Sequence, residues 1–525
     1  MSLDRVKAKI PRIIKVTARF ILNWLSDISN RLLSDQKGYR RLLQWTQEMP
    51  VSNGSRYFQT ADIRVGVVAD SFVWQNYSPT CQLIALTPDN WKTQLQKIDC
   101  ILVTSAWRGL NQEWVGLGTH GNAIRTELLA LMRQAKSDGL PVLFYSKEDP
   151  PNFHCFAEFA QEADYVFTSA EECIPRYQEC CPNAIVNALP FAVNPLIHNP
   201  IGSARPKWEG TVFFAGSWMA KYPERTEKMK KIFGWIQKTG MEVRIADRNF
   251  ARRDFRYQYP FRYLKYVVGS FDYKQIAVLY KIFPFCLNFN SVTNSNTMFA
   301  MRVYDALASG ARVLSNDSLG VRRLFPEVHI IDTYDDFAAA VTMSDAECTK
   351  EKLSGIRRVF QEGTVFEKMA QMLQTAGIEN NFQRFRPVAV ILSPDIPDAD
   401  RDRYVQMFSA QSYPNKKLFY GWQEISNAGH FDMVTVWGPN RSYGAFYLED
   451  MINGFKYTDC DYVTKYAAAG DISQRQYEFT DRILDLYATV FWRTSVTMNQ
   501  LENFGEEEIL IPNGFISDAF HYDII

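Results

Sequence analysis

The sequence has no excess of either charge, since Lys and Arg together number 58 and so do Asp and Glu. Without a basic surplus no overall field attracts a polyanion, so we expect no nucleic-acid partner and only local phosphate recognition. Histidine is scarce, with 6 residues in 525 and none in a helical pair beside a glutamate. This scarcity leaves little material for a zinc site, and we expect no metal and no cofactor.

The 9 cysteines are scattered, without C-x-x-C pairs and without the density of a secreted disulfide scaffold. We therefore expect reduced thiols and a cytoplasmic protein. Low-complexity tracts are also lacking, and 46% of the residues are hydrophobic, so the chain should fold as a globular protein. Its 525 residues exceed what one hydrophobic core holds and predict about three domains.

The N-terminal segment lacks an apolar run long enough to span a bilayer or to form a cleavable signal. Residues 5–34 nevertheless carry one helical stripe of isoleucines and leucines, with a basic opposite face. One interpretation is a helix that lies in an anionic membrane surface, which would make the protein peripheral on the inner face of the membrane. The other is a helix that packs on the protein or on a second copy, as in a homodimer.

After the first 60 residues, short apolar runs alternate with helical patterns. Nearly continuous apolar strands that alternate with helices predict right-handed crossovers and a parallel sheet covered on both faces. A linker rich in Pro, Gly and polar residues at 198–210 separates two such sets. The candidate strands are 63–70, 99–107, 141–149 and 164–170 in the first set and 210–216, 242–247, 285–290, 311–316 and 328–332 in the second, with helices at 122–139, 297–309 and 350–376.

This pattern predicts an α/β fold of two Rossmann-like, doubly wound lobes followed by a further α/β module. Because ligands of such sheets bind beyond the carboxyl ends of the strands, we expect the site between the two lobes. The predicted divisions are a helical segment 1–60, a first lobe 61–203, a second lobe 204–380 and a third module 386–525.

Residues 290–317 form the most informative segment, in which a strand runs through Asn, Ser and Thr residues into a helix expected to begin at Thr297. Backbone N–H groups at such a helix start stabilise a diphosphate. Arg302 and Asp305 share one helix face, and the carboxylate can accept hydrogen bonds from ribose hydroxyls, although a surface helix acid is the alternative. The candidate donor contacts in this segment are Asn296, Thr297, Met298, Arg302 and Asp305.

Two further pairs of residues are candidates. Lys221 and Arg225 follow the first strand of the second lobe, and an arginine fork matches phosphate oxygens bidentately. Asp149 and His154 follow a strand of the first lobe, where an acceptor should bind, and are candidate catalytic acid or base. Without other support each would be an ordinary solvated surface residue.

The nine residues from Asp305 to Val313, DALASGARV, resemble the ribose-binding Glu-Ala-x-Ala-x-Gly-x-Pro-Val-type segment of retaining GT-B glycosyltransferases. Over residues 62–376, SAWRG (105–109), KEDPPNFHCF (147–156) and FAGSWMAKYPER (214–225) are similar to the spore-maturation-protein-like (CgeB-like) group. The resemblance implies a UDP- or GDP-sugar donor in the second lobe and a glycan or glycolipid acceptor in the first. It also implies retention at the anomeric carbon. The first two lobes lack an Asp-x-Asp metal motif, which favours metal-independent transfer. The leading hypothesis for the acceptor is a cell-surface polysaccharide, teichoic acid or glycolipid.

Two positions depart from the family pattern, since Thr297 replaces a glutamate and Gly216-Ser217 replaces Gly-Arg. A non-catalytic glycan-binding or scaffold protein is therefore the alternative, and a nucleotide-sugar epimerase ranks last. The third module resembles the GT-A fold, but Gly438-Pro439-Asn440 stands where its metal-binding acids belong. We interpret this module as catalytically degenerate and expect it to bind glycan, dock a partner or dimerise.

Overall fold

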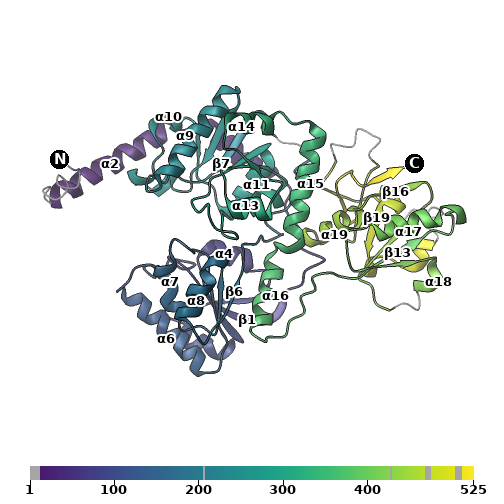
Figure 1. Cartoon of the computed structure of the whole chain (residues 1–525), viewed down its shortest axis with the longest axis horizontal. Coiled ribbons are helices and arrows are strands. Elements are labelled where there is room, and N and C mark those ends of the chain that lie inside the picture. The colour runs from purple at the N-terminus through teal and green to yellow at the C-terminus, as the bar shows by residue number, and fades with distance from the viewer. Residues whose placement is uncertain (1–11, 205–206, 253, 426–428, 468–474, 503–510) are drawn as a thin grey trace.

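The computed structural model describes residues 12–204, 207–252, 254–425, 429–467, 475–502 and 511–525. Figure 1 shows two α/β lobes, one above the other, with a third domain beside them and a long N-terminal helix that projects from the upper lobe. The lower lobe carries the N-terminal sheet, and the upper lobe the second sheet. The predicted α/β fold class, with two Rossmann-like lobes and a further C-terminal domain, is confirmed.

The first lobe is a six-stranded parallel sheet in the order β2-β1-β3-β4-β5-β6. The sequence predicts β1, β3, β4 and β5 but misses β2 and β6, because these two edge strands are only partly buried and lack a continuous apolar run. The elements are β1 (Ala61–Val68), α4 (Ser71–Tyr77), β2 (Cys81–Ala85), α5 (Trp91–Gln94), β3 (Cys100–Thr104), α6 (Ala123–Ser137), β4 (Val142–Ser146), α7 (Phe153–Ala160), β5 (Tyr165–Thr168), α8 (Ile174–Cys180) and β6 (Ile185–Ala188).

The second lobe is also six-stranded and parallel, in the order β12-β11-β10-β7-β8-β9. In chain order this is the Rossmann arrangement, whose strand order reverses between β7 and β10 and opens a crevice at their carboxyl ends. Its elements are β7 (Thr211–Ala215), α9 (Pro223–Lys238), β8 (Glu242–Ala246), α10 (Phe261–Leu264), β9 (Val267–Gly269), α11 (Tyr273–Ile282), β10 (Phe285–Asn288), α12 (Arg302–Ala308), β11 (Arg312–Ser315), α13 (Leu319–Leu324), β12 (His329–Ile330) and α14 (Tyr334–Val341).

The helix predicted at 350–376 is two helices, α15 (Asp345–Glu362) and α16 (Val365–Thr375). The chain breaks at Gly363, and Thr364 then begins α16 with a capping box that Glu367 completes. Val193 of the first lobe donates its N–H to Gly363 O at 2.8 Å and accepts from Val365 N at 2.9 Å. The chain thus crosses back from the second lobe, and α16 packs against α4 of the first.

The third domain is a seven-stranded mixed sheet in the order β14-β13-β15-β19-β17-β20-β18, with β16 and β21 paired beside it. Helix α19 is buried along its whole length. The likeness of this domain to the GT-A fold stays a prediction. Its elements are β13 (Val388–Leu392), α17 (Arg401–Ser409), β14 (Lys416–Phe419), α18 (Trp422–Ile425), β15 (Met433–Trp437), β16 (Arg441–Tyr443), α19 (Tyr447–Tyr457), β17 (Tyr462–Thr464), β18 (Glu478–Thr480), β19 (Thr489–Trp492), α20 (Met498–Glu502), β20 (Gly514–Ile516) and β21 (Tyr522–Ile524).

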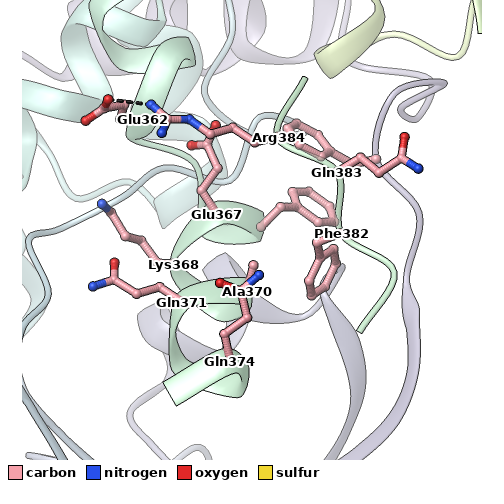
Figure 2. Close-up of a pocket in the computed structure, with 11 residues that line it drawn as sticks. Glu362, Glu367, Lys368, Ala370, Gln371, Gln374, Phe382, Gln383 and Arg384 are labelled. Atoms are coloured by element: carbon pink, nitrogen blue, oxygen red, sulfur yellow. Dashed lines mark hydrogen bonds and ion pairs between the residues drawn. The ribbon is translucent and has the colours of Figure 1, made fainter. Parts of the chain in front are cut away.

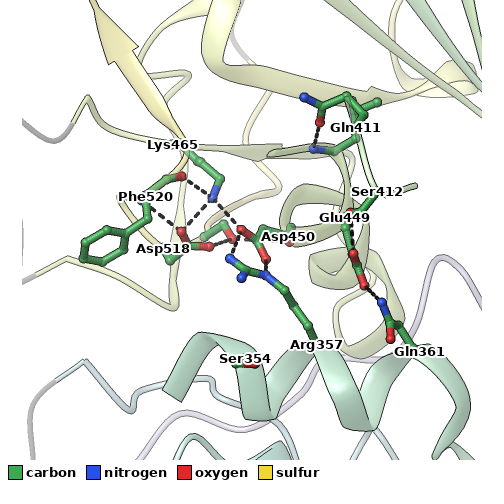
Figure 3. A network of polar contacts seen from close by, with 12 residues as sticks. Ser354, Arg357, Gln361, Gln411, Ser412, Glu449, Asp450, Lys465, Asp518 and Phe520 are labelled. Atoms are coloured by element: carbon green, nitrogen blue, oxygen red, sulfur yellow. Dashed lines mark hydrogen bonds and ion pairs between the residues drawn. The ribbon is translucent and has the colours of Figure 1, made fainter. Parts of the chain in front are cut away.

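A buried ionic network joins the third domain to the second lobe (Figure 3). Arg357 of α15 donates to both carboxylate oxygens of Asp450 on α19, at 2.6 and 2.8 Å. Lys465, which follows β17, lies 2.7 Å from Asp518 and 3.5 Å from Asp450. Burial raises the pKa of Asp450 to about 6. Buried charges of this kind persist only when they are paired, so the network depends on all four residues.

We expect Lys465→Met to destabilise the protein by about 3–5 kcal/mol, because it leaves two buried carboxylates without their shared cation. Thermal unfolding measures this loss. The matched control is Arg133→Met, which removes the exposed pair with Glu162 and should leave the melting temperature near that of the wild type. Equal melting temperatures for both variants would contradict a stabilising role for the network.

The N-terminal segment forms α2 (Arg12–Leu33) and α3 (Gln36–Glu48), both of which pack on the second lobe. The contacts of α2 are polar: Asn23 Oδ1 accepts from Phe255 N at 3.2 Å, and Ser26 O accepts from Gln258 Nε2 at 3.3 Å. Of the predicted apolar stripe, Ile21, Leu25 and Leu32 are exposed, whereas Ile28 is partly buried. Large apolar side chains exposed on α2 are Phe20, Ile21, Leu22, Trp24, Leu25, Leu32 and Leu33.

Helix α2 thus packs on the second lobe while large apolar side chains on it stay exposed, and contact of these side chains with a membrane or with a second copy stays a prediction. Residues 5–11 of the predicted stripe lie outside the described residues. No helix among those described combines the length and the apolar character needed to cross a bilayer.

Candidate functional site

Hydrogen-bonded asparagines lie at the carboxyl edge of the second sheet, at the point where the strand order reverses. Asn290, two residues after β10, donates its N–H to Asn316 Oδ1 at 2.6 Å, just after β11. Asn288 Nδ2 donates to Asn290 Oδ1 at 3.0 Å, and the same oxygen accepts from Ala300 N at 2.9 Å. These bonds fix the loop that leads from β10 to α12, and they place amide groups beside the crevice.

Two arginines converge at the same edge. The guanidinium carbon of Arg225 lies 5.9 Å from the ring centroid of Phe214 on β7, and that of Arg302 lies 5.1 Å from it. Arg225 donates to Ser217 O at 3.1 Å, and Arg302 donates to Asn288 Oδ1 at 3.1 Å. Among the described residues, no carboxylate forms an ion pair with either group.

The charge of this cluster is unbalanced. Burial, and to a smaller extent the neighbouring Arg302 and Arg248, lower the pKa of Arg225 to about 10, so its guanidinium group stays charged at neutral pH. The nearby Asp247 is buried, which raises its pKa to about 6. Like charges held together in a partly desolvated place repel one another, and a bound anion relieves that repulsion. An arrangement of this kind can hold a phosphate group.

A cavity of about 200 Å³ opens beside Arg225. Its walls combine cations, hydroxyls and amides, which suit a phosphate, with one acid at Glu224. The lining residues are Tyr222, Pro223, Glu224, Arg225, Lys228, Asn290, Ser291, Thr293 and Asn316. Lys221 is exposed next to it, with its ammonium 4.7 Å from the ring centroid of Tyr222. Sequence reasoning thus located Lys221, Arg225 and Arg302 at one edge.

Asn296, Thr297 and Met298 lie elsewhere, at the contact with the first lobe. Thr297 Oγ1 donates to Ser169 O at 2.9 Å and accepts from Glu171 N at 2.9 Å. Asn296 donates to the carboxylate of Glu171 at 2.9 Å, and Met298 packs on the core of the first lobe. The helix predicted to begin at Thr297 begins at Arg302. The prediction that a helix begins at Thr297 is therefore wrong. Residues 296–298 instead contact the first lobe and join the two lobes.

Asp305 is buried, with 6% of its surface exposed. Its Oδ1 lies 3.6 Å from His198 Nε2, and both of these atoms are without a hydrogen-bond partner in the described part of the chain. Burial raises the pKa of Asp305 to about 8 and lowers the pKa of His198 to about 3. The expectation that Asp305 faces open space for a ribose is thus corrected, since α12 turns it toward the connection between the lobes.

The burial of Asp305 predicts a specific pH dependence. The unfolded carboxyl loses its proton near 3.8, whereas the folded one keeps it to about 8, so in this window the folded state binds more protons and stability falls as the pH rises. Relative to wild type, Asp305→Asn should gain up to about 1.4 kcal/mol per pH unit between these limits. Denaturant titrations across this window measure the difference. A difference that is independent of pH would contradict the shifted pKa.

In the first lobe, Asp149 is fully buried. Its carboxylate accepts hydrogen bonds from Thr168 Oγ1 at 2.6 Å and Tyr177 OH at 3.0 Å. Burial raises its pKa. The expectation of an accessible acid at Asp149 is corrected, because its buried carboxylate accepts hydrogen bonds from Thr168 of β5 and Tyr177 of α8. His154 is exposed on α7, and its backbone oxygen contacts His120 Nε2 at 3.1 Å. It remains a candidate base.

The carboxyl edge of the first sheet holds a cation that sequence reasoning missed. Lys147, which follows β4, is almost fully buried and lies 3.5 Å from Asp70 and 3.2 Å from Glu148. Asp70, which follows β1, accepts the backbone N–H groups of Trp107 and Arg108 at 3.0 and 2.9 Å. The two parallel strands bring these residues to one rim, as their position after strands predicts.

A second cavity, of about 310 Å³, lies between α16 and the chain that leads to the third domain (Figure 2). Phe58, Phe366 and Phe382 line it together with the ion pair of Glu362 and Arg384. None of its lining residues follows a strand of either parallel sheet, so it is not the candidate site. Within the described part of the chain, no three His, Cys, Asp or Glu side chains cluster as metal ligands.

Residues 229–374 match a family model described as glycosyl transferase-like. The matched segment runs from α9 to α16 and includes the asparagine-rich loop and Arg302, but Arg225 lies just before it. The prediction of a glycosyltransferase is confirmed at the level of this match, for the second lobe. A comparison with curated proteins found no match.

Three solved structures are similar to part of the chain. Trehalose-6-phosphate synthase OtsA is 13% identical over 55% of this chain and 75% of that chain, with a TM-score of 0.37. Anabaena HepE, solved with UDP and glucose, is 12% identical over 60% and 91%, with a TM-score of 0.37. An alpha-glucosyltransferase solved with UDP and a 13-mer DNA is 8% identical over 61% and 100%, with a TM-score of 0.43. These likenesses concern overall shape only.

Proposed function

We propose that this protein transfers a sugar from a nucleoside diphosphate donor, UDP- or GDP-linked, to a glycan or glycolipid of the cell surface. The observation that carries the proposal is the cluster of Arg225, Arg302 and Arg248 at the strand reversal of the second sheet, without a carboxylate ion pair at Arg225 or Arg302 among the described residues. The glycosyl transferase-like match of residues 229–374 supports the same reaction class.

The chemistry follows from the charge of the leaving group. As the bond to the anomeric carbon breaks, negative charge grows on the diphosphate, and cations already in place stabilise it more in the transition state than in the ground state. Arg225 is well suited to this task, because its contact with Ser217 O fixes one arm of the guanidinium. Lys221 and Lys228 add charge at the rim of the cavity.

The acceptor is proposed to bind at the first lobe. The rim of Asp70, Lys147 and Glu148 offers charged and hydrogen-bonding groups, and His154 is an exposed base on the same lobe. Retention at the anomeric carbon, independence of metal and a catalytically degenerate GT-A-like third domain are proposed from the sequence resemblance.

A non-catalytic glycan-binding protein is the second candidate, because both Asp149 and Asp305 are buried. Assays with a panel of sugar nucleotides separate the two functions, since a binding protein would show no turnover.

We expect Arg225→Ala to weaken UDP and GDP binding by about 10- to 100-fold, the effect of losing a charge-assisted phosphate contact. The control is Lys231→Ala, which removes an exposed cation from the same helix, α9, outside the cavity. Isothermal titration calorimetry on both variants measures the effect. If neither nucleotide binds the wild type, or if the two variants bind equally well, the donor site is not at Arg225.

We also propose that α2 attaches the protein to the cytoplasmic surface of a membrane, within the segment 5–34. Phe20 and Trp24 are 71% and 57% exposed on the outward face of α2, and aromatic side chains of this kind partition into the bilayer interface. Cations lie on neighbouring helices, since α10 contacts α2 and shares with α9 a groove lined by Lys230, Lys231, Arg262 and Lys265. Such charge suits anionic lipid.

Vesicle co-sedimentation tests this attachment. The double variant Phe20→Glu with Trp24→Glu should be released from vesicles that contain phosphatidylserine, because two charges are unfavourable in the interface. Val115→Glu, an equally charged change at an exposed apolar residue of the first lobe, should stay bound. Equal sedimentation of all forms would contradict the attachment, and a lower oligomeric state of the α2 variant would then indicate that a second copy covers this face.

A further inference from the structure

A cavity of about 560 Å³ lies where the two lobes and the chain between them meet. Its size is that of a site for a small organic ligand. It shares no lining residue with the cavity beside Arg225. The lining residues are Val51, Ser52, Trp74, Gln75, Ser78, Pro79, Asn194, Leu196, Ile197, Asn199, Lys274, Val278 and Lys281.

Two lysines of α11 supply the charge of this cavity. Lys281 is 4% exposed, and its ammonium donates to Asn199 Oδ1 at 3.0 Å. Lys274 stands two helical turns earlier on the same face and is exposed. None of the lining residues is an acid. A buried ammonium with one amide acceptor and no carboxylate is costly, and burial lowers the pKa of Lys281 to about 7.

The rest of the cavity wall is suited to an organic anion. Asn194 and Asn199 are held by local hydrogen bonds, since Asn194 Nδ2 donates to Gln75 O at 3.0 Å and Asn199 Nδ2 donates to Pro195 O at 2.8 Å. The lining also includes Trp74 of α4, Leu196 and Ile197 of the connecting segment, and Val278 of α11, which offer apolar surface. An apolar wall beside fixed polar groups is the usual composition of a small-molecule site.

We propose that this cavity binds a small organic anion, whose phosphate or carboxylate pairs with Lys281 and Lys274 and whose ring or apolar body packs against Trp74 and Val278. The ligand would contact both lobes at once, because α4 belongs to the first lobe and α11 to the second. The site is independent of the proposed donor site, so it stands even if no nucleotide binds at Arg225.

Calorimetry with three probes of one shape tests the proposal. Phenyl phosphate and benzoate carry an anion and an aromatic body, and phenol carries the body alone. Wild-type protein should bind one or both anions and not phenol, and the anion that binds better identifies the headgroup. Lys281→Met should weaken that binding by at least about tenfold, the effect of one charge-assisted hydrogen bond. Lys274→Ala should weaken it less, because this lysine is solvated.

Lys231→Ala is the matched control, because it removes an exposed cation of α9 that lines neither of the two cavities, and it should leave binding of the anionic probes unchanged. Thermal unfolding checks that Lys281→Met folds. If it does not fold, the binding affinity of Lys274→Ala for the anionic probe is compared with that of the wild type instead. The proposal is overturned if neither anion binds, if Lys281→Met and Lys274→Ala both bind as well as the wild type, or if Lys231→Ala alone abolishes binding.

Discussion

Arg225 and Arg302 approach one aromatic ring, Phe214, from two different helices, and this convergence of like charges constrains the second lobe. Repulsion between guanidinium groups is unfavourable unless an anion lies between them, so the fold must hold them there by other means. It does so with backbone and amide oxygens, at Ser217 and Asn288, that accept hydrogen bonds without neutralising charge. The positive potential that results is directed into the crevice where the strand order reverses.

The fold could largely be predicted from the sequence because buried parallel strands are continuous apolar runs. Strands β3 and β4 are buried at each position and were predicted, whereas the half-exposed edge strands β2 and β6 were not. The division of the predicted helix 350–376 was missed for a different reason. Glycine is tolerated inside helices, and here the chain breaks where Gly363 and Val365 pair with Val193, a contact between residues far apart in the sequence.

The candidate site could be predicted only in part. Arg225 and Lys221 were identified because they follow a strand end, a property that is local in the sequence. The prediction that Asp305 faces open space for a ribose was wrong, because spacing along a helix shows which residues share a face but not what that face contacts. Here it contacts His198, from the connection between the lobes. Arg248 and Lys147 were missed although both follow strands, so the rule that located Arg225 would also have found them.

The ionic network at Arg357 attaches the third domain to α15, whereas α16, after the break at Gly363, belongs by its contacts to the first lobe. A rotation of one lobe against the other must therefore be absorbed at the crossing between these two helices. The third domain contacts segments on both sides of that crossing, because Asp450 of α19 pairs with Arg357 of α15 and Asp461 pairs with Arg56, shortly before β1. A rotation of the lobes would therefore also have to be accommodated at these two ion pairs.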